Sequence, residues 1–532
     1  MKIPWVLGAT LTCVLAAGSV SMAAGDDTPR QFDYVIRNGL VVDGSGSVPY
    51  RADVAIAGDR IVAIGDLSKV VAEHDIDASG LVVTPGFIDV HSHAADGLIA
   101  EDRSAAVPLL AQGLTTVIVN PDGGGPLDMA TQQAELLEHG LGVNVAQFVP
   151  HGTLRRQVIG MEDRLANDDD LEAMGMLLDA AMKDGAIGLS SGVFYAPASY
   201  SDTNELIELA KIAAQYGGVY ASHIRDESDY SIGLAASVDE VISIATAAGI
   251  TSVVTHIKAA GPSSWKTSGA IINKIEKARA NGVDVWADQY PYVAASTGLG
   301  SALIPRWAMA GGIADMRARF DEPKTLAKIY QAIDDNLVRR GGAERVIIGA
   351  SAEFPISGMS LAKIAEQWEL SAAAATVTIL RKEQVGIISF NMDAFDVANF
   401  MQPDWVMTST DGGYPTWGVG NPHPRSFGAF ARKIRKYVIE DELITLQAAV
   451  RSMSGLSASV FDLTDRGQLE SGAYADVLVF DPTEFRDQAT FQEPFQLATG
   501  IQYALVNGRL AIDDGKATGE LAGRILVRAG SQ

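Results

Sequence analysis

Two different spacings of hydrophobic residues divide the chain into a middle and two similar ends. From Phe32 to Ile76, and again in YADVLVFDPTEF and IQYALVNGRLAIDDGK, short apolar runs alternate with polar residues. Asn-Gly, Asp-Gly and Gly-Asp pairs lie between such runs, a pattern typical of strands joined by tight turns. We therefore predict that both ends pair into one small β-sandwich domain, built from residues 25–83 and 456–532.

The middle of the chain, residues 84–455, repeats a pattern of an apolar strand followed by an amphipathic helix. Helical stretches such as NELIELAKIAAQYG and VDEVISIATAAG separate the strands. Strand then helix, repeated about eight times, predicts an α/β fold of the (β/α)8 TIM-barrel type, although a doubly wound open sheet has the same local rhythm. Residues 299–342 are long for one connection, so we expect an inserted lobe near the barrel mouth. The predicted strands lie in TTVIVN, GAIGLSSG, GGVYASHI, TSVVTHI, DVWADQYPY, RVIIGAS, VGIISF and WVMTSTDG.

The composition and net charge indicate which kinds of molecule the protein binds. Of the 532 residues, 47% are hydrophobic, which suits a large core, and the formal net charge is −24. A nucleic-acid groove needs a concentrated surface of lysine and arginine, and this charge argues against one. We expect an acidic protein that acts on a small molecule, and the sequence leaves its oligomeric state open.

The beginning of the chain has the pattern of an export signal. Lys2 precedes an apolar run that ends in small residues before Asp26. We expect a signal peptide over residues 1–24 and a periplasmic or secreted protein without stable membrane insertion, the alternative being a retained membrane anchor. Cys13, the only cysteine, lies inside this signal, so a metal site in the mature chain must use histidine and carboxylate ligands.

Four of the eight histidines fall where predicted strands end. His91 and His93, in VTPGFIDVHSHAAD, lie two residues apart, so on a strand both face the same side. His223 follows VYAS, and His256 follows SVVT. A lone histidine at a strand end is more often a solvated loop residue, but side chains at the carboxyl ends of barrel strands converge. Four histidines in equivalent positions therefore predict a shared metal ion.

Charged residues near these histidines complete the candidate chemistry. Asp411, in STDGG, follows a late strand; alone it would be a turn former, but beside a histidine cluster it is a candidate general base that deprotonates a metal-bound water. Lys258 lies two residues after His256, and Arg225 lies two residues after His223. Either cation can capture a substrate carboxylate or form an ordinary salt bridge at the rim.

Longer stretches of the chain resemble a known family. They include PGFIDVHSH, GLTTVIV, GAIGLSSGVFYAPASYSDTNELIELAKIA, YASHIRDES, THIKAAGPSSW, DQYPYVAAST, STDGG, NPHPRSFGAFARKIRKYV, GQLESGAYADVLVFDP and ALVNGR. In this order and spacing they resemble the amidohydrolase superfamily and, more narrowly, the D-aminoacylases, which are N-acyl-D-amino-acid deacylases. The resemblance covers nearly everything after the predicted signal.

The resemblance implies one or two divalent metal ions, with Zn²⁺ the expected ion. It implies that Asp122, His223 and His256 form the tighter site and that His91 and His93 complete a second one. The best-known members have a zinc-binding cysteine where this chain has Asp122, in VNPDGGG. A carboxylate can also bind Zn²⁺, so we predict Asp122 as a ligand, the alternative being a Pro-Asp-Gly turn.

The same resemblance favours Lys258 and Tyr290 as the groups that hold the α-carboxylate of the substrate. The activity expected is metal-dependent hydrolysis of N-acyl-D-amino acids to a carboxylate and a free D-amino acid. A related amidohydrolase acting on dipeptides, D- or isoaspartyl-containing, or on cyclic amides would share every metal residue. A periplasmic binding protein that uses the barrel mouth without catalysis is a further alternative.

Overall fold

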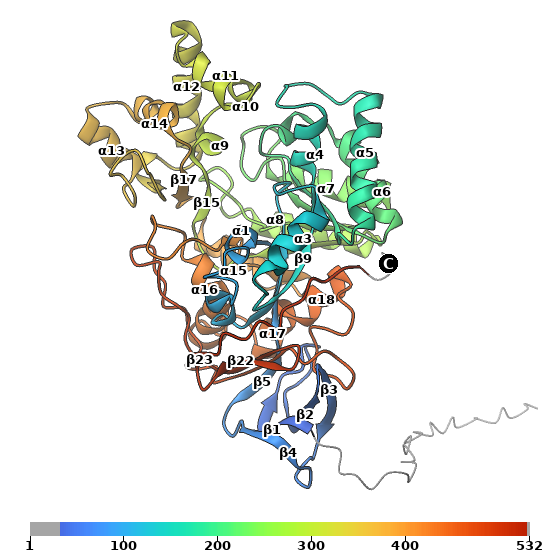
Figure 1. Ribbon diagram of the computed structural model, residues 1–532. Helices are drawn as coiled ribbons and strands as arrows, with labels where there is room; N and C mark the ends of the chain where they lie inside the picture. Colours follow the sequence, from blue (N-terminus) through green and yellow to red (C-terminus); the bar gives the residue numbers. More distant parts are fainter. Residues whose placement is uncertain (1–31, 529–532) are drawn as a thin grey trace, which may run out of the picture.

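The computed structural model describes residues 32–528, and they form an α/β protein. The predicted signal peptide, residues 1–24, lies outside the described residues. Strands from both ends of the chain share one nine-stranded sheet, in the order β23-β22-β21-β20-β5-β1-β2-β3, with β4 beside β1. In Figure 1 these segments lie side by side at the bottom of the molecule. The strands are β1 (Phe32–Val41), β2 (Tyr50–Ala57), β3 (Arg60–Gly65), β4 (Ala72–Asp77), β5 (Val82–Pro85), β20 (Val477–Phe480), β21 (Ile501–Val506), β22 (Arg509–Asp513) and β23 (Lys516–Ala517).

The middle of the chain contributes parallel strands. One sheet has the order β6-β8-β9, another has the order β10-β11-β12-β13-β14-β18, and β7 pairs in parallel with β19. Strands β8, β11 and β12 are buried along their whole length, as expected where helices cover a parallel sheet. The strands are β6 (Phe87–Asp89), β7 (Ser92–His93), β8 (Leu114–Val119), β9 (Asn144–Gln147), β10 (Val149–Pro150), β11 (Gly188–Gly192), β12 (Val219–His223), β13 (Thr251–Val254), β14 (Val285–Gln289), β18 (Val406–Thr408) and β19 (Gly412–Gly413).

Helices connect these strands, and local sequence sets several of their ends. Asn167 and Asp170 form a reciprocal capping box at the start of α5, and Asp202 accepts a hydrogen bond from the Glu205 amide at the start of α6. Gly249 ends α7 with a left-handed φ of 62°, which glycine adopts without strain. The helices are α1 (Ala95–Leu98), α2 (Val107–Leu110), α3 (Met129–Glu138), α4 (His151–Val158), α5 (Asp168–Lys183), α6 (Thr203–Gln215), α7 (Leu234–Ala248), α8 (Ser268–Ala280), α15 (Ala394–Phe400), α16 (Arg425–Arg432), α17 (Leu446–Met453) and α18 (Gly455–Phe461), with 3₁₀ turn η1 (Ala198–Tyr200) and π-helical segment η3 (Lys433–Glu440).

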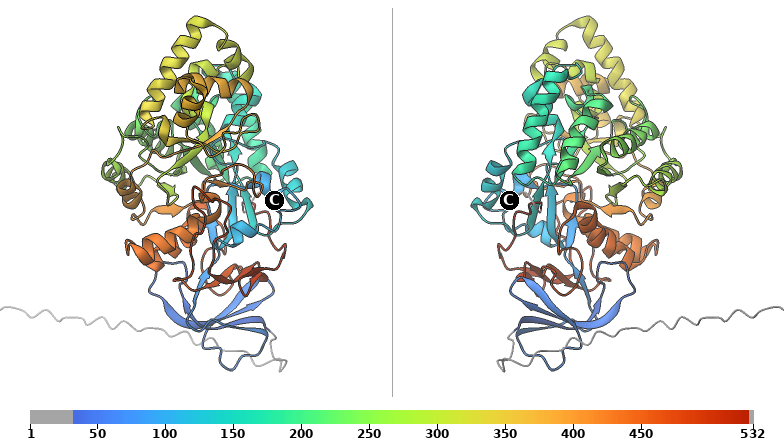
Figure 2. Two further views of the ribbon diagram at one scale, coloured as in Figure 1. Left: turned by 90° about the vertical axis from the view of Figure 1, so that its left-hand side faces the viewer. Right: turned by 90° about the vertical axis from the view of Figure 1, so that its right-hand side faces the viewer.

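A separate lobe follows β14, and it is larger than the sequence pattern predicts. It has its own hydrophobic core, with buried residues from Leu299 to Ile387, and it lies at the opposite end of the molecule from the nine-stranded sheet (Figures 1 and 2). Its elements are strands β15 (Ala295–Gly298), β16 (Val346–Ile348) and β17 (Gly386–Ser389), helices α9 (Leu299–Leu303), α10 (Arg306–Met309), α11 (Ile313–Arg319), α12 (Pro323–Arg339), α13 (Leu361–Trp368) and α14 (Ala372–Lys382), and the 3₁₀ turn η2 (Ala343–Arg345).

Two predicted barrel strands belong to this lobe instead. RVIIGAS contains β16 and VGIISF contains β17, and the two pair antiparallel in the order β15-β17-β16. The expectation that both lie among the parallel strands is therefore wrong. A short apolar run has the same appearance in either sheet, because pairing depends on contacts far apart in the chain.

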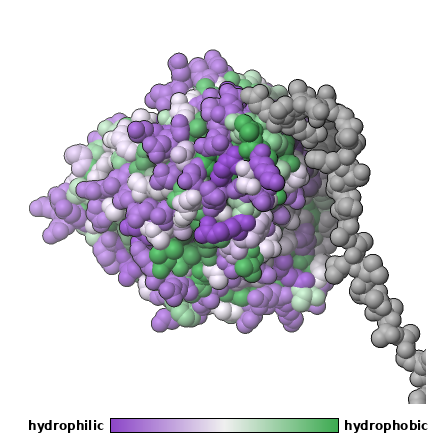
Figure 3. All heavy atoms as spheres, turned by 90° about the horizontal axis from the view of Figure 1, so that it is seen from below, coloured by the Kyte–Doolittle hydropathy of each residue, from purple (hydrophilic) through white to green (hydrophobic). Residues whose placement is uncertain are grey.

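One face of the molecule shows how polar and apolar residues are distributed on the surface. The face below the nine-stranded sheet is mainly hydrophilic, with apolar residues in scattered groups (Figure 3). Among residues 32–528, no helix combines the length and the hydrophobicity that crossing a bilayer requires.

Candidate metal centre

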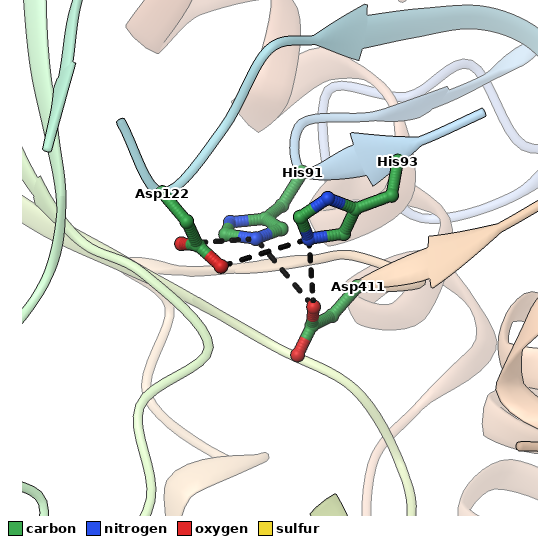
Figure 4. A group of neighbouring side chains, drawn as sticks. All are labelled: His91, His93, Asp122 and Asp411. Atoms are coloured by element: carbon green, nitrogen blue, oxygen red, sulfur yellow. Dashed lines mark ion pairs between the residues drawn. The ribbon is translucent and has the colours of Figure 1, made fainter. Parts of the chain in front are cut away.

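The residues predicted to bind metal come together at the carboxyl ends of the parallel strands. His91 follows β6, His93 lies in the short strand β7, and Asp122 follows β8. His223 is the last residue of β12, and His256 lies just beyond β13. Figure 4 shows His91, His93 and Asp122 facing one another and Asp411, which follows β18. Function gathers at this edge of parallel strands because their ends leave it open for loops and side chains.

Two sets of ligand atoms meet at Asp122. One set consists of His91, His93, Asp122 and Asp411, and the other of Asp122, His223 and His256; within each, the candidate ligand atoms lie within 4.8 Å of one another. Asp122 Oδ1 lies 3.4 Å from His91 Nε2 and 3.5 Å from His256 Nε2. Asp122 Oδ2 lies 3.6 Å from His93 Nε2 and 3.7 Å from His223 Nδ1. Asp122 therefore faces both sets, and any ions held there would share this carboxylate.

The hydrogen-bonding state of these atoms fits a metal. Both ring nitrogens of His91, both of His223 and Oδ1 of Asp122 are buried and have no hydrogen-bond partner within residues 32–528. Buried polar atoms without partners are costly, and a divalent ion coordinated by them would remove that cost. The set of imidazoles and carboxylates is the kind that Zn²⁺ accepts.

The charges of the cluster point to the same conclusion. Burial alone would raise the pKa of the Asp122 carboxyl, but the charges of His91 and His256 lower it by more. The resulting pKa lies well below its usual value. Burial lowers the pKa of His93, yet Asp122 and Asp411 raise it to about 9. Burial and Lys258 lower the pKa of His256, which the two aspartates nevertheless raise to about 10. The ionised carboxylates thus favour positive charge between the imidazoles, supplied by protons or by a divalent cation.

Buried polar residues fix the backbone around the ligands. Asp89 Oδ1 accepts hydrogen bonds from the Thr410 amide at 2.9 Å and from the His91 amide at 3.2 Å, so it ties the Asp411 loop to the His91 segment. Burial raises the pKa of Asp89 to about 6, although these hydrogen bonds lower it. Asp288 Oδ1 accepts from the His256 amide at 3.0 Å. Such supporting contacts hold metal ligands in position.

Asp411 has two differently placed oxygens. Oδ1 lies 3.3 Å from His93 Nε2 and 3.6 Å from His91 Nε2, facing the first ligand set. Oδ2 accepts a hydrogen bond from Arg425 Nη1 at 2.6 Å. Burial raises the pKa of Asp411, but Arg425 and His256 lower it more, and the net pKa is below the usual range. The carboxylate is therefore ionised and oriented, with Oδ1 turned toward the candidate metal positions.

The cluster opens into a pocket of about 450 Å³, whose lining includes His93, Asp122, Lys258, Tyr290 and Asp411. Lys258 Nζ donates to Glu227 Oε1 at 2.5 Å and lies 2.7 Å from His256 Nδ1. Tyr290 Oη is buried without a partner. Lys258 and Tyr290 thus both line the space in front of the candidate metal ligands.

The sequence is similar over nearly its whole length to proteins named as deacylases. Residues 394–512 match the model of a family described as "Amidohydrolase family". An N-acyl-D-glutamate deacylase of Alcaligenes xylosoxydans xylosoxydans is 36% identical over 94% of this chain and 98% of its own length. The chain belongs to the D-aminoacylase family of amidohydrolases. A D-aminoacylase from the same organism is 35% identical over 95% of this chain and 99% of its own length.

A solved structure supports this membership of the D-aminoacylase family. The N-acyl-D-glutamate deacylase of Bordetella bronchiseptica, complexed with zinc and a phosphonate inhibitor that mimics the tetrahedral intermediate, has a TM-score of 0.80 with this chain. It is 34% identical, and the match covers 94% of this chain and all of that one. The fold of the family thus extends over nearly the whole described chain.

Arg225 is not placed where the expectation of a substrate ligand requires. Its Nε donates to Glu240 Oε2 at 3.0 Å, and its Nη2 donates to Glu240 Oε1 at 2.7 Å. It is also absent from the residues that line the pocket. The expectation that Arg225 captures a substrate carboxylate is therefore corrected. Its guanidinium forms an ordinary salt bridge, which was the alternative, and the partner Glu240 lies in helix α7.

Two residues of the site were missed by sequence reasoning. Glu227, in HIRDES, pairs with Lys258, and Arg425, in NPHPR, pairs with Asp411. His423 Nδ1 accepts a hydrogen bond from the Arg425 amide at 3.0 Å and so fixes the start of α16. Glu227 and Arg425 lie inside stretches that carry the family resemblance, and this was the one sequence feature that could have indicated them. A charged residue in a loop belongs to no hydrophobic periodicity that would mark it.

Proposed function

We propose that this protein hydrolyses the amide bond of N-acyl-D-amino acids, releasing a carboxylate and a free D-amino acid with the help of bound Zn²⁺. The observation that carries the proposal is the convergence of four histidines and two aspartates at one pocket. Whole-length similarity to deacylases of N-acyl-D-amino acids supports the substrate class.

The residues proposed to hold zinc are Asp122, His223 and His256 in one position, with His91, His93 and the shared Asp122 in the second. A zinc ion bound there supplies the positive charge that acidifies a water molecule and polarises the acyl carbonyl. Because metal ligation needs neutral imidazoles, His93 and His256 would hold the ion in their unprotonated form. Asp122 takes the position where other members of the family have cysteine, as the resemblance implies.

Asp411 is proposed as the group that moves the proton. Its Oδ1 faces the ligand cluster, while Arg425 holds Oδ2 at 2.6 Å, so one oxygen remains available to the attacking water. The carboxylate takes a proton from that water as it attacks the acyl carbon. The same oxygen then donates the proton to the departing amine, since the leaving nitrogen must be protonated when the amide bond breaks.

Lys258 and Tyr290 are proposed to hold the α-carboxylate of the substrate. Both line the pocket, and the buried Tyr290 hydroxyl has no competing hydrogen-bond partner. Fixing the carboxylate orients the amide carbonyl toward the candidate metal ligands. The binding energy of the carboxylate thus holds the reacting atoms in position. With the α-carboxylate and the amide both fixed, the side chain of a D substrate and that of an L substrate would point to different walls of the pocket, which allows the two to be distinguished.

The parallel strands are proposed to form one closed (β/α)8 barrel, with a small β-sandwich domain from residues 25–83 and 456–532 and a barrel from residues 84–455. The pairings β6-β8-β9, then β10 to β18, and the link between β19 and β7 support closure. A shared core of residues from β6, β8, β9, β12, β13 and β18 supports it too. The signal-like residues 1–24 suggest export, and we propose that the enzyme works in the periplasm or is secreted.

A matched panel of N-acetyl-D-amino and N-acetyl-L-amino acids tests this function. The mature chain is stripped of metal with a chelator and reloaded with Zn²⁺, and release of the free amino acid is measured. Turnover that returns with zinc and is confined to D substrates is expected. Turnover only of dipeptides or cyclic amides would move the function to a related hydrolase, and tight binding without any turnover would favour a binding protein.

A further inference from the structure

The lobe brings one unusual cation into the pocket. Arg340 caps the carboxyl end of α12, lines the same pocket as the metal ligands and is only 5% exposed. Its Nε is buried without a hydrogen-bond partner, and its guanidinium forms no ion pair among residues 32–528. A buried guanidinium without hydrogen bonds or a counter-charge is costly, and a protein retains one where a ligand completes it.

The other cations of the pocket already have counter-charges. Lys258 pairs with Glu227 at 2.5 Å, and Arg425 pairs with Asp411 at 2.6 Å. Arg339, next to Arg340 in the chain, lies 3.5 Å from Asp229 Oδ1. Among the lysine and arginine side chains that line the pocket in residues 32–528, Arg340 is therefore the one without an ion pair.

The surroundings of Arg340 add to this positive potential and offer a further donor. Arg306, from α10, donates within residues 32–528 only to carbonyl oxygens. Burial and, to a smaller extent, the charge of Arg340 lower its pKa to about 10, although Tyr230 and Tyr195 raise it. Arg340 lies over the ring of Tyr230 at 5.8 Å, and the Tyr230 hydroxyl is buried without a partner. A guanidinium and a free hydroxyl together are the donors that a carboxylate accepts.

Aromatic contacts connect Arg340 and Tyr230 to the candidate metal ligands. The Tyr230 ring lies 5.3 Å from the ring of Phe194, which lies 5.6 Å from the ring of His223. All three side chains line the pocket. A substrate whose amide reaches His223 can thus extend along this wall toward Arg340.

We propose that Arg340 binds a second carboxylate of the substrate, so that the preferred substrates are N-acyl-D-amino acids with an additional anionic group. The inference rests on the proposed deacylase function. Two sources of the carboxylate share this chemistry: an acidic side chain, as in D-glutamate or D-aspartate, or the distal end of a dicarboxylic acyl group, as in an N-succinyl compound. In each case the second carboxylate supplies the counter-charge that the lobe leaves missing.

The test compares substrates of matched shape. For the wild-type enzyme loaded with Zn²⁺, kcat/KM is measured on N-acetyl-D-glutamate, N-acetyl-D-glutamine, N-acetyl-D-leucine and N-succinyl-D-leucine. Arg340→Gln should lower kcat/KM by about 10- to 100-fold on the dianionic substrates, as loss of a charge-assisted hydrogen bond predicts. It should change kcat/KM on N-acetyl-D-glutamine and N-acetyl-D-leucine, which have no second carboxylate, by less than about threefold. Loss on N-acetyl-D-glutamate identifies the side chain as the source, and loss on N-succinyl-D-leucine identifies the acyl group.

Arg339→Gln is the matched control, because it removes the adjacent charge, which already pairs with Asp229. It should preserve the preference for dianionic substrates. Equal loss on all four substrates in Arg340→Gln, or an unchanged ratio of glutamate to glutamine, would overturn the proposal. Arg340→Lys, which keeps the charge but not the fork, is expected to recover part of the preference and guards against a folding defect.

A binding measurement separates failure of this proposal from failure of the proposed function. Calorimetric titration with D-glutamate and D-glutamine requires no turnover. The wild type should bind D-glutamate at least about tenfold more tightly, and Arg340→Gln should bind both alike. Absence of hydrolysis with this binding difference intact would refute the deacylase function alone, whereas hydrolysis without any preference for a second charge would refute the role of Arg340 alone.

Discussion

Lys433→Met should change how the stability of the protein depends on pH. Lys433 begins η3 and is 1% exposed. Its Nζ donates to Thr408 Oγ1 at 2.7 Å and to Ser452 Oγ at 2.8 Å, both neutral hydroxyls. Thr408 is the last residue of β18, the strand that leads to Asp411, so this ammonium supports the segment carrying the candidate base.

The size of the effect follows from the desolvation of the ammonium group. Burial lowers the pKa of Lys433 from 10.5 to about 7. Between these two values the unfolded chain holds a proton that the folded chain has released, so stability rises with pH in this window. The slope is about 1.4 kcal/mol per pH unit, and the whole lowering corresponds to about 4 to 5 kcal/mol, a penalty fully present below pH 7.

The assay measures the free energy of unfolding in urea by tryptophan fluorescence at pH 7.5, 8.5 and 9.5. Stability of the wild type relative to Lys433→Met should rise by about 2 to 3 kcal/mol across this range, since methionine does not titrate. Lys436→Met is the control: Lys436 lies in the same segment, is more exposed and pairs with Asp441 at 2.9 Å. Parallel pH profiles for the wild type and Lys433→Met would refute the argument, because they would mean that the ammonium stays charged or hydrated in the folded protein.

Three further predictions concern the metal centre. Asp411→Asn should keep its zinc content but lose about 10²- to 10⁴-fold in kcat, and near-normal turnover would contradict its proton-transfer role. Asp122→Ala should lose zinc, measured by atomic absorption, whereas Asp122→Cys should retain it; equal zinc in Asp122→Ala and the wild type would remove Asp122 from the ligands. Lys258→Met should raise KM for N-acetyl-D-amino acids by about 10- to 100-fold, while Arg225→Gln, whose guanidinium is bound to Glu240, should leave KM almost unchanged; the reverse order would exchange their roles.

Much of the chemistry could be anticipated because it is carried by short stretches. The spacing of His91 and His93 and the positions of His223 and His256 at strand ends pointed to a metal, and the structure brings all four to within reach of Asp122. The family resemblance is confirmed by whole-length similarity. The individual roles of these residues stay predictions that the variants above test.

The sequence by itself determined where apolar strands and amphipathic helices lie and which residues can ligate a metal, because hydrophobic periodicity and ligand chemistry are local properties. Only the tertiary structure decided that β16 and β17 pair antiparallel in the lobe. It also decided which cations are neutralised: Arg225 pairs with Glu240, while Arg340 has no ion pair within residues 32–528. Strand pairing and charge compensation depend on distances between segments far apart in the chain, and hydrophobic patterning does not encode those distances.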